Sequence, residues 1–380
     1  RFMLGLGISL ARGAFASIVT YVKDGLKLFY NFTEHQDNPI SHASAGSTSF
    51  VTDDYIDIPD DNSLDITSNI SISCWIKHSG ATFSDWDGII CKDDTGTSPE
   101  YMILGKSGTG SVRCGFNNSS DVEKSLDSVT VLSQNTWHHI AWTYDGADLK
   151  LYIDGDLDGT SNIGSQTIRT SSENLRIGYF ATSDRFFNGS LANVGIWSRA
   201  LSASEVQGIM YKQYSDLGSV DKASLVSFWG LDATSLGSEL VTNGDFATGD
   251  FTDWDSSGNG WSVSGGVATF AYTDEGNSKL IQDIGLADNK TYKLKFDYTR
   301  TSGSFTARVY DGGYVTLGTY SSASDSIELD FLNTGNDGRI ILTAVSTTFA
   351  GTIDNISVTE IQATDNHSTN QGSISGATTN

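Results

Sequence analysis

Residues 137–155 constrain the fold of this chain more than any other stretch. From 137 to 144, β-branched and aromatic residues alternate with other types, which suits a pleated strand. Asp145-Gly146 interrupts the run, and apolar residues then occupy every second position from 149 to 153. Asp154-Gly155 is a favoured sequence for a two-residue hairpin turn. The stretch therefore predicts two half-buried antiparallel strands joined by tight turns.

Composition extends this prediction to the whole chain. The 380 residues include 40 Gly and only 3 Pro, and many short strand-like runs are separated by Gly- and Asp-rich turns. We therefore expect an all-β protein of two tandem β-sandwich (jelly-roll) domains. The formal net charge of −23 argues against nucleic acid as a partner, because such binding depends on Lys and Arg neutralising phosphates.

The three cysteines give no disulfide framework, because their number is odd. Cys74 lies in an alternating apolar run from 70 to 76, so we expect a small core residue. A bridge between Cys91 and Cys114 stays open, and no spacing indicates zinc.

The first two-thirds of the chain resembles the laminin-G-like / concanavalin-A-like lectin family. The resemblance rests on Trp137, His139, Tyr144-Asp145-Gly146 and the strand that ends in Asp154-Gly155. Further matches lie at 54–59, 70–76, 187–197 and 199–202, so the resemblance covers about residues 24–235. It implies a sandwich whose first strand (25–32) neighbours its last (224–231). A short helix is expected at 202–210, because Ser202 and Glu205 have capping-box spacing.

A second domain is expected over residues 238–362. Its opening Asn243-Gly244-Asp245-Phe246 and its closing Ile353-Asp354-Asn355-Ile356 resemble carbohydrate-binding jelly rolls attached to polysaccharide-degrading enzymes. That resemblance implies a structural calcium ion held partly by Asp354. Ala247 stands where an acidic ligand is expected, so the calcium site stays open. The remaining residues, 363–380, are mainly Ser, Thr, Asn, Gly and Gln, and this composition predicts a mobile polar tail.

Residues 1–23 are apolar and rich in glycine. They could be a secretory signal or a membrane span, but Arg12 and the glycines interrupt a span. We favour an arm that anchors the chain to a partner, with no membrane span. The segment resembles the opening of marine tailed-phage virion proteins, in which a similar start leads into a laminin-G-like domain.

No catalytic residues are predicted. Glycosidases need two carboxylates close together, and no two glutamates here lie within twenty residues of each other. His138 and His139 are adjacent in a strand and point to opposite faces, so they cannot chelate one ion together. We expect His139 to be a hydrogen-bonded structural residue.

Aromatic side chains in loops are the candidates for stacking on sugar rings: Trp86, Trp254, Trp261 and Tyr314. The tryptophans in strand-like runs are expected in the core: Trp75, Trp142, Trp197 and Trp229. For calcium, the candidate ligands are Asp154, Asp156 and Asp158, together with Asp354. Most such aspartates are solvated turn residues, which is the competing interpretation.

These features favour a non-enzymatic phage virion structural protein, either a capsid decoration protein or a fibre (adhesin). Residues 1–23 would bind other virion proteins, the assembly would be oligomeric, and the lectin-like sandwiches would reach host glycans at the virion surface. The alternative is a secreted, extracellular bacterial lectin or adhesin module. A glycosidase is the weakest hypothesis.

Overall fold

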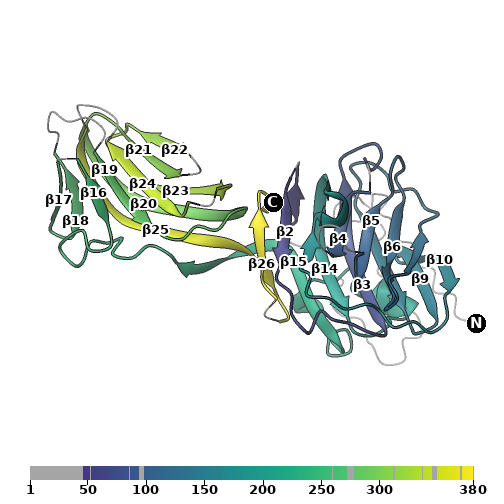
Figure 1. Cartoon of the computed structure of the whole chain (residues 1–380). Helices are drawn as coiled ribbons and strands as arrows, with labels where there is room; N and C mark the ends of the chain where they lie inside the picture. Colours follow the sequence, from purple (N-terminus) through teal and green to yellow (C-terminus); the bar gives the residue numbers. More distant parts are fainter. Residues whose placement is uncertain are drawn as a thin grey trace, which may run out of the picture. The chain divides into compact units, whose positions relative to one another are not determined.

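The computed structural model describes residues 46–379 except 52, 85, 94–97, 259, 272–277, 311–312, 336, 345–348 and 369. The predicted anchor (1–23) and the predicted opening strand (25–32) lie outside the described residues. Strands make up 55% of the chain and helices 4%, so the all-β prediction is confirmed (Figure 1).

The first sandwich consists of two antiparallel layers. One layer has this order across the sheet: β1 (Thr48–Phe50), β14 (Gly189–Trp197), β3 (Ile70–His78), β8 (His138–Tyr144), β9 (Asp148–Ile153) and β10 (Asp156–Asn162). The other layer consists of β2 (Tyr55–Ile58), β11 (Leu175–Ile177), β4 (Gly88–Lys92), β5 (Tyr101–Gly105), β6 (Val112–Asn117) and β7 (Glu123–Asp127). Short segments β12 (Tyr179–Phe180), η1 (Ala181–Ser183) and β13 (Arg185–Phe186) connect β11 to β14.

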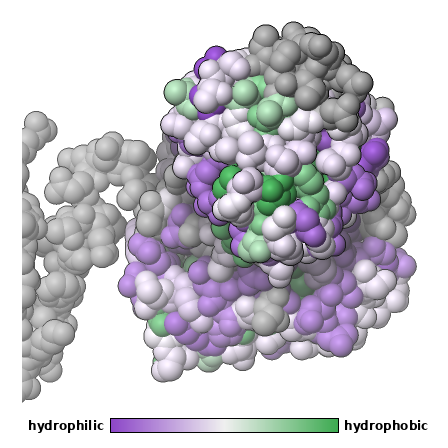
Figure 2. Space-filling view, turned by 90° about the vertical axis from the view of Figure 1, so that its left-hand side faces the viewer, coloured by the Kyte–Doolittle hydropathy of each residue, from purple (hydrophilic) through white to green (hydrophobic). Residues whose placement is uncertain are grey.

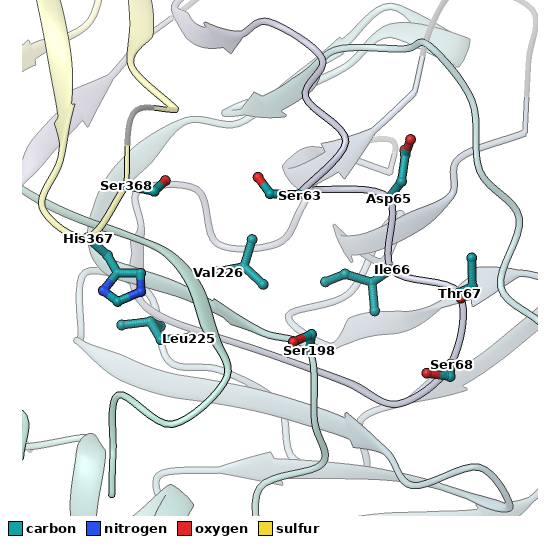
Figure 3. A pocket seen from close by; sticks show the side chains of 10 residues that line it. All are labelled: Ser63, Asp65, Ile66, Thr67, Ser68, Ser198, Leu225, Val226, His367 and Ser368. Atoms are coloured by element: carbon teal, nitrogen blue, oxygen red, sulfur yellow. The ribbon is translucent and has the colours of Figure 1, made fainter. Parts of the chain in front are cut away.

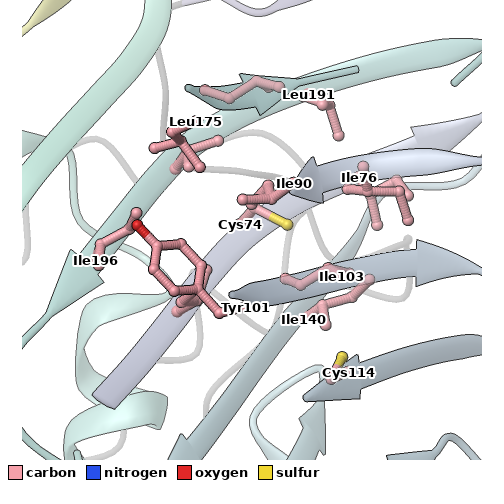
Figure 4. Packing of buried hydrophobic residues seen from close by; sticks show 14 of the residues in the cluster. Cys74, Ile76, Ile90, Tyr101, Ile103, Cys114, Ile140, Leu175, Leu191 and Ile196 are labelled. Atoms are coloured by element: carbon pink, nitrogen blue, oxygen red, sulfur yellow. The ribbon is translucent and has the colours of Figure 1, made fainter. Parts of the chain in front are cut away.

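The hairpin predicted from residues 137–155 is present as β8 and β9. Asp154 and Gly155 both have positive φ, 54° and 84°, as the tight turn between β9 and β10 requires. The inward residues of both layers form one buried cluster between the sheets (Figure 4). Cys74 and Cys114 lie in this cluster, and all three cysteines are buried and free, so Cys91 and Cys114 are not bridged.

The four tryptophans predicted in the core are each at most 1% exposed. Three of them donate their indole N–H to backbone oxygens of distant segments: Trp75 to Met210, Trp197 to Asp221 and Trp229 to Asn370. These bonds fix the loops and the C-terminal segment to the sheets, because a buried indole N–H needs an acceptor.

The predicted helix is α1 (Ala203–Ile209). Ser202 caps it, and Glu205 completes the capping box, as the spacing predicts. Hydrogen bonds from Arg199 lower the pKa of Glu205 to about 2. A 3-10 turn, η2 (Tyr214–Asp216), follows before the chain enters β15 (Leu225–Glu239).

The second sandwich also has two layers. One layer has this order across the sheet: β23 (Ser324–Asn333), β20 (Lys290–Ser302), β25 (Ala350–Asp365), β18 (Val267–Phe270) and β17 (Trp261–Ser264). The other is a five-stranded sheet in the order β16 (Asp255–Ser257), β19 (Lys279–Asp283), β24 (Arg339–Ala344), β21 (Phe305–Tyr310) and β22 (Tyr314–Tyr320). A separate cluster of aromatic and aliphatic residues fills the space between these layers.

Residues 363–380 do not form the mobile tail that their composition predicts. After β25, the chain forms β26 (Gly372–Ser375), which pairs with β2, and β27 (Thr378–Thr379), which pairs with β1. Figure 1 shows β26, in yellow, beside β2, in purple. Alternation along β26 turns Ile374 inward, and Ala377, which follows this strand, is also buried in the core of the first sandwich.

The second sandwich is therefore an insertion in the first. The chain leaves the first sandwich along β15 and returns along β25, and these two strands pair with each other from Trp229↔Asp365 to Glu239↔Thr359.

His139 is buried, as expected of a structural residue, but its Nδ1 lacks the hydrogen-bond partner that we predicted for this side chain. Its ring is 1% exposed and lies 5.4 Å from the ring of Trp75. Burial lowers the pKa of His139 to about 4, and the nearby Asp154 charge opposes this shift only in part. His138 accepts a hydrogen bond from the Ser133 amide at Nε2, which leaves Nδ1 to donate to Asp154 at 2.8 Å.

Replacing Ile374 tests whether the C-terminal segment is part of the core. We expect Ile374→Ala to lower the free energy of unfolding by about 2–5 kcal/mol, because a cavity would open between the sheets. Chemical denaturation measures the change. Leu332, which is 39% exposed, is the control, and Leu332→Ala should cost less than about 0.5 kcal/mol. Equal small effects for both variants would contradict a structural role for this segment.

His139 should also make stability depend on pH. In the unfolded chain the imidazole takes up a proton near its ordinary pKa of 6.5, whereas the folded protein resists protonation down to about 4. Stability should therefore fall as the pH falls through this window, by at most about 1.4 kcal/mol per pH unit from this group. Denaturation of the wild type and His139→Gln between these pH values measures it. An identical slope for both proteins would refute this assignment.

Candidate functional site

The predicted calcium ligands at the β9–β10 turn already have hydrogen-bond partners. Asp154 accepts from the His139 amide and from His138, and Asp158 accepts from the amides of Val129 and Thr130. Asp156 is exposed. Within the described ranges, no three His, Cys, Asp or Glu side chains form a group that could hold a metal ion. These aspartates thus stabilise loops, and the structure does not assemble them into a ligand set.

Asp354 lies opposite Asp297 in the β20–β25 ladder. Burial raises the pKa of Asp354, and the negative charges of Asp297 and Asp245 raise it further. A cation at this position would relieve the repulsion, so calcium at Asp354 stays a prediction.

Three of the four predicted sugar-stacking aromatics are partly or fully engaged within the protein. Trp254 is 5% exposed and packs with Phe246, so it is a core residue and the prediction that it faces solvent is wrong. Trp261 is half-buried against Phe270. Trp86 is half-buried beneath the guanidinium of Arg113, which lies 4.6 Å from its ring centroid.

Tyr314 is different, since its side chain is 50% exposed. It begins β22 at one edge of the five-stranded sheet, and its ring meets that of Tyr310 edge-on at 5.3 Å. The guanidinium of Arg339 lies 4.5 Å from the Tyr310 ring. We call the surface around these residues the outer face of the five-stranded sheet, because it lies on the side away from the core.

Alternation along β21 and β24 creates the outer face. Phe305, Ala307 and Val309 point into the core, so Thr306, Arg308 and Tyr310 point outward. The same alternation on β24 turns Arg339, Ile341 and Thr343 outward. Register places Thr306 opposite Thr343, and Arg308 opposite Ile341.

A side-chain bridge crosses this face. Lys279 of β19 donates from Nζ to the Tyr314 hydroxyl at 2.6 Å, and its Nζ lies 4.3 Å from the ring centroid. Strands β24 and β21 separate β19 from β22, so the two backbones are roughly 14 Å apart at the usual strand spacing. Two long side chains therefore reach toward each other from opposite strands and meet over the middle of the sheet.

The floor beneath this bridge contains polar atoms without partners. Thr343 is 0% exposed and Thr306 is 3% exposed, yet neither hydroxyl has a hydrogen-bond partner. The buried Nε of Arg308 also has none. Unpaired buried polar groups are costly, and they are most often found where a ligand or water supplies the missing bond.

The outer face is electropositive. The hydrogen bond from Lys279 is the main cause that lowers the pKa of Tyr314, and the charges of Lys279, Arg339 and Arg308 add to it. At one end, Asp337 forms a bidentate ion pair with Arg339, and Asp283 lies opposite Arg339 in the ladder. Positive charge is therefore least compensated at Arg308 and Lys279.

The sequence analysis identified only Tyr314 of this group. Alternation along 305–310 could have placed Thr306, Arg308 and Tyr310 on one face. The pairing of β19, β24, β21 and β22 joins segments up to about 60 residues apart, and no local pattern gives that order.

A second candidate is an open pocket of about 500 Å³ in the first sandwich (Figure 3). Side chains from four segments line it, among them Asp65, Ser198, Leu225 and His367. The Asp65 carboxylate pairs with the buried Lys92 at 3.2 Å, and the His367 ring bonds the Tyr214 hydroxyl. No aromatic ring of Phe, Tyr or Trp is among its lining residues in the described part of the chain, so it offers less to a sugar than the outer face does.

Figure 2 shows one face of the molecule, which is mostly hydrophilic or neutral, with small hydrophobic groups near its centre and toward its top. In the part of the chain that the structure describes, no helix has the length and apolar character needed to cross a membrane.

Comparisons with known proteins agree with the first sandwich. Residues 50–207 match the model of the concanavalin A-like lectin/glucanases superfamily. No curated protein matches the chain.

Several solved structures are similar to parts of this chain, at low identity and with TM-scores below 0.5. A Bacteroides ovatus protein described as a candidate carbohydrate binding protein is 18% identical with a TM-score of 0.41, over 54% of this chain and 55% of that one. The Ruminococcus gnavus IT-sialidase CBM40, bound to α2,3 sialyllactose, is 14% identical with a TM-score of 0.36, over 45% of this chain and 100% of that one. Domain 4 of the Geobacillus stearothermophilus arabinanase AbnA, in complex with arabinotriose, is 17% identical with a TM-score of 0.34, over 40% of this chain and 71% of that one.

This chain spans about half the length of the Bacteroides protein. Likenesses this distant carry no inference about its ligands. The family match and the two-layered architecture are consistent with each other: residues 50–207 are similar to the concanavalin A-like lectin/glucanases superfamily, and they lie in a two-layered β-sandwich.

Proposed function

We propose that this protein binds carbohydrate without catalysis, through the outer face of the five-stranded sheet. The observation that carries the proposal is the combination of two buried, unpartnered hydroxyls, Thr306 and Thr343, with the exposed ring of Tyr314 above them. Sugar rings present C–H groups on their faces and hydroxyls at their edges. An aromatic ring beside polar groups that lack partners is complementary to both.

A binding role is favoured over hydrolysis. Glycosidases hold two carboxyl groups at a defined separation, one on each side of the scissile bond. Among the described residues of the outer face, the carboxylates of Asp337 and Asp283 lie around Arg339 rather than beside the bridge. The sequence also lacks paired glutamates, as noted above.

For the biological setting, we propose display on the surface of a phage virion, as a decoration protein or fibre that binds host glycans. The support is the resemblance of residues 1–23 to the start of tailed-phage virion proteins, together with the lectin-like domain that follows. The alternative is a secreted bacterial lectin or adhesin module, with the same binding face.

Removing the Tyr314 ring should weaken glycan binding. Once a glycan array has identified a bound saccharide, we expect Tyr314→Ala to reduce affinity about tenfold, since a buried aromatic contact is often worth more than 1 kcal/mol. Calorimetric titration measures the change. Val315→Ala is the control on the same strand, because register places Val315 opposite the core residue Val309. Unchanged affinity in Tyr314→Ala, or release of shorter saccharides during the assay, would contradict the proposal.

Deleting residues 1–23 should abolish incorporation into the virion but not glycan binding. We expect the truncated protein to remain folded and to bind glycan, but to be missing from assembled particles. Incorporation into purified particles, measured by mass spectrometry, is the readout. Normal incorporation of the truncated protein would refute the anchor. A native N-terminus at Ser17 would instead support the secreted alternative.

A further inference from the structure

Arg308 has an unusual environment for an arginine in this chain. The other described arginines each donate to a carboxylate or a backbone oxygen. The Nε of Arg308 is buried and has no hydrogen-bond partner, and its guanidinium lies 5.8 Å from the Tyr314 ring centroid. With 46 acidic residues against 23 basic ones, acidic partners are abundant in this protein. A partly buried guanidinium without one is therefore a feature that needs an explanation.

Lys279 adds a second cation above the same floor. Its Nζ donates to the Tyr314 hydroxyl, a neutral group, so its charge is not neutralised there. Both cations therefore lie close to the Tyr314 ring, Lys279 at 4.3 Å and Arg308 at 5.8 Å from its centroid. The hydroxyls of Thr306 and Thr343 lie beneath and also lack partners.

We propose that the outer face binds a sugar that carries an oxyanion, a carboxylate or a sulfate ester, with Arg308 and Lys279 as its charge partners. This inference rests on the proposed carbohydrate binding and specifies the substrate class. A guanidinium can donate two parallel hydrogen bonds to either oxyanion, and such charge-assisted bonds are the strongest available to a side chain. The rings of Tyr310 and Tyr314 contact the sugar face.

The net negative charge of the protein means that binding of an acidic sugar must depend on local contacts. A net charge of −23 repels an acidic polymer at long range, so non-specific attraction cannot account for binding of such a ligand. A short acidic saccharide held by Arg308 and Lys279 avoids most of this repulsion, because salt screens charges more than about 10 Å away.

Two pairs of oligosaccharides test the inference, each pair differing only in its charged group. The first is oligogalacturonate and its methyl ester, and the second is a carrageenan oligosaccharide and its desulfated form. We expect the wild type to bind the charged member of at least one pair roughly tenfold or more tightly than the neutral member. The pair that discriminates identifies the oxyanion as a carboxylate or a sulfate.

Variants assign the discrimination to these residues. Arg308→Met should remove the preference for the charged member, and Arg308→Lys should retain part of it. Lys279→Met should independently reduce the preference for the charged oligosaccharide. Lys295→Met is the matched control, because Lys295 pairs with Glu328 on the opposite sheet. Thermal unfolding checks that each variant is folded.

Equal binding of charged and neutral members by the wild type would overturn this inference and leave carbohydrate binding standing. A full preference in both Arg308→Met and Lys279→Met would also overturn it. Absence of binding to all four oligosaccharides and to a glycan array would overturn this inference together with the proposed function.

Discussion

The antiparallel pairing of β15 with β25 is the interaction on which the rest of the structure depends. These strands belong to both sandwiches, because each has one end in the core of the first and the other end in the sheet of the second. Their ladder replaces a flexible linker with backbone hydrogen bonds. It also brings the chain back to the first sandwich, where β26 and β27 pair with β2 and β1. Folding of the first sandwich thus requires residues from both ends of the described chain.

The five-stranded sheet of the second sandwich does not take part in this pairing. Its inner residues form the second core, whereas its outer residues include cations, tyrosines and two buried hydroxyls that lack hydrogen-bond partners. The protein keeps unpaired polar groups on this face although acidic partners are abundant. A binding site explains this cost, because preorganised groups lose less free energy when a ligand arrives than groups that must first leave other partners.

Much of the fold could be predicted from local sequence patterns. Alternation gave the strands around residues 137–155, capping-box spacing gave α1, and the strand tryptophans were correctly assigned to the core. The polar segment after residue 363 was mispredicted, because its few apolar residues, such as Ile374, gain their burial only from distant strands. Composition reports the average of a segment, whereas burial depends on which alternate positions face a sheet.

The site was harder to predict for the same reason. Trp254 lies in a loop-like stretch but packs into the core, and Arg308 lies in an ordinary strand but faces the candidate ligand. Strand order brings Lys279 and Tyr314 together across two intervening strands, and sequence alone does not specify that order.

The most direct test of the account is to observe the floor of the outer face during binding. The methyl groups of Thr306 and Thr343 can be labelled and followed by NMR while an acidic oligosaccharide is added. We predict saturable shifts of these two signals, with the threonines of the first sandwich unchanged. Saturable shifts confined to Thr67, beside the pocket that contains His367, would place the ligand elsewhere and contradict the account.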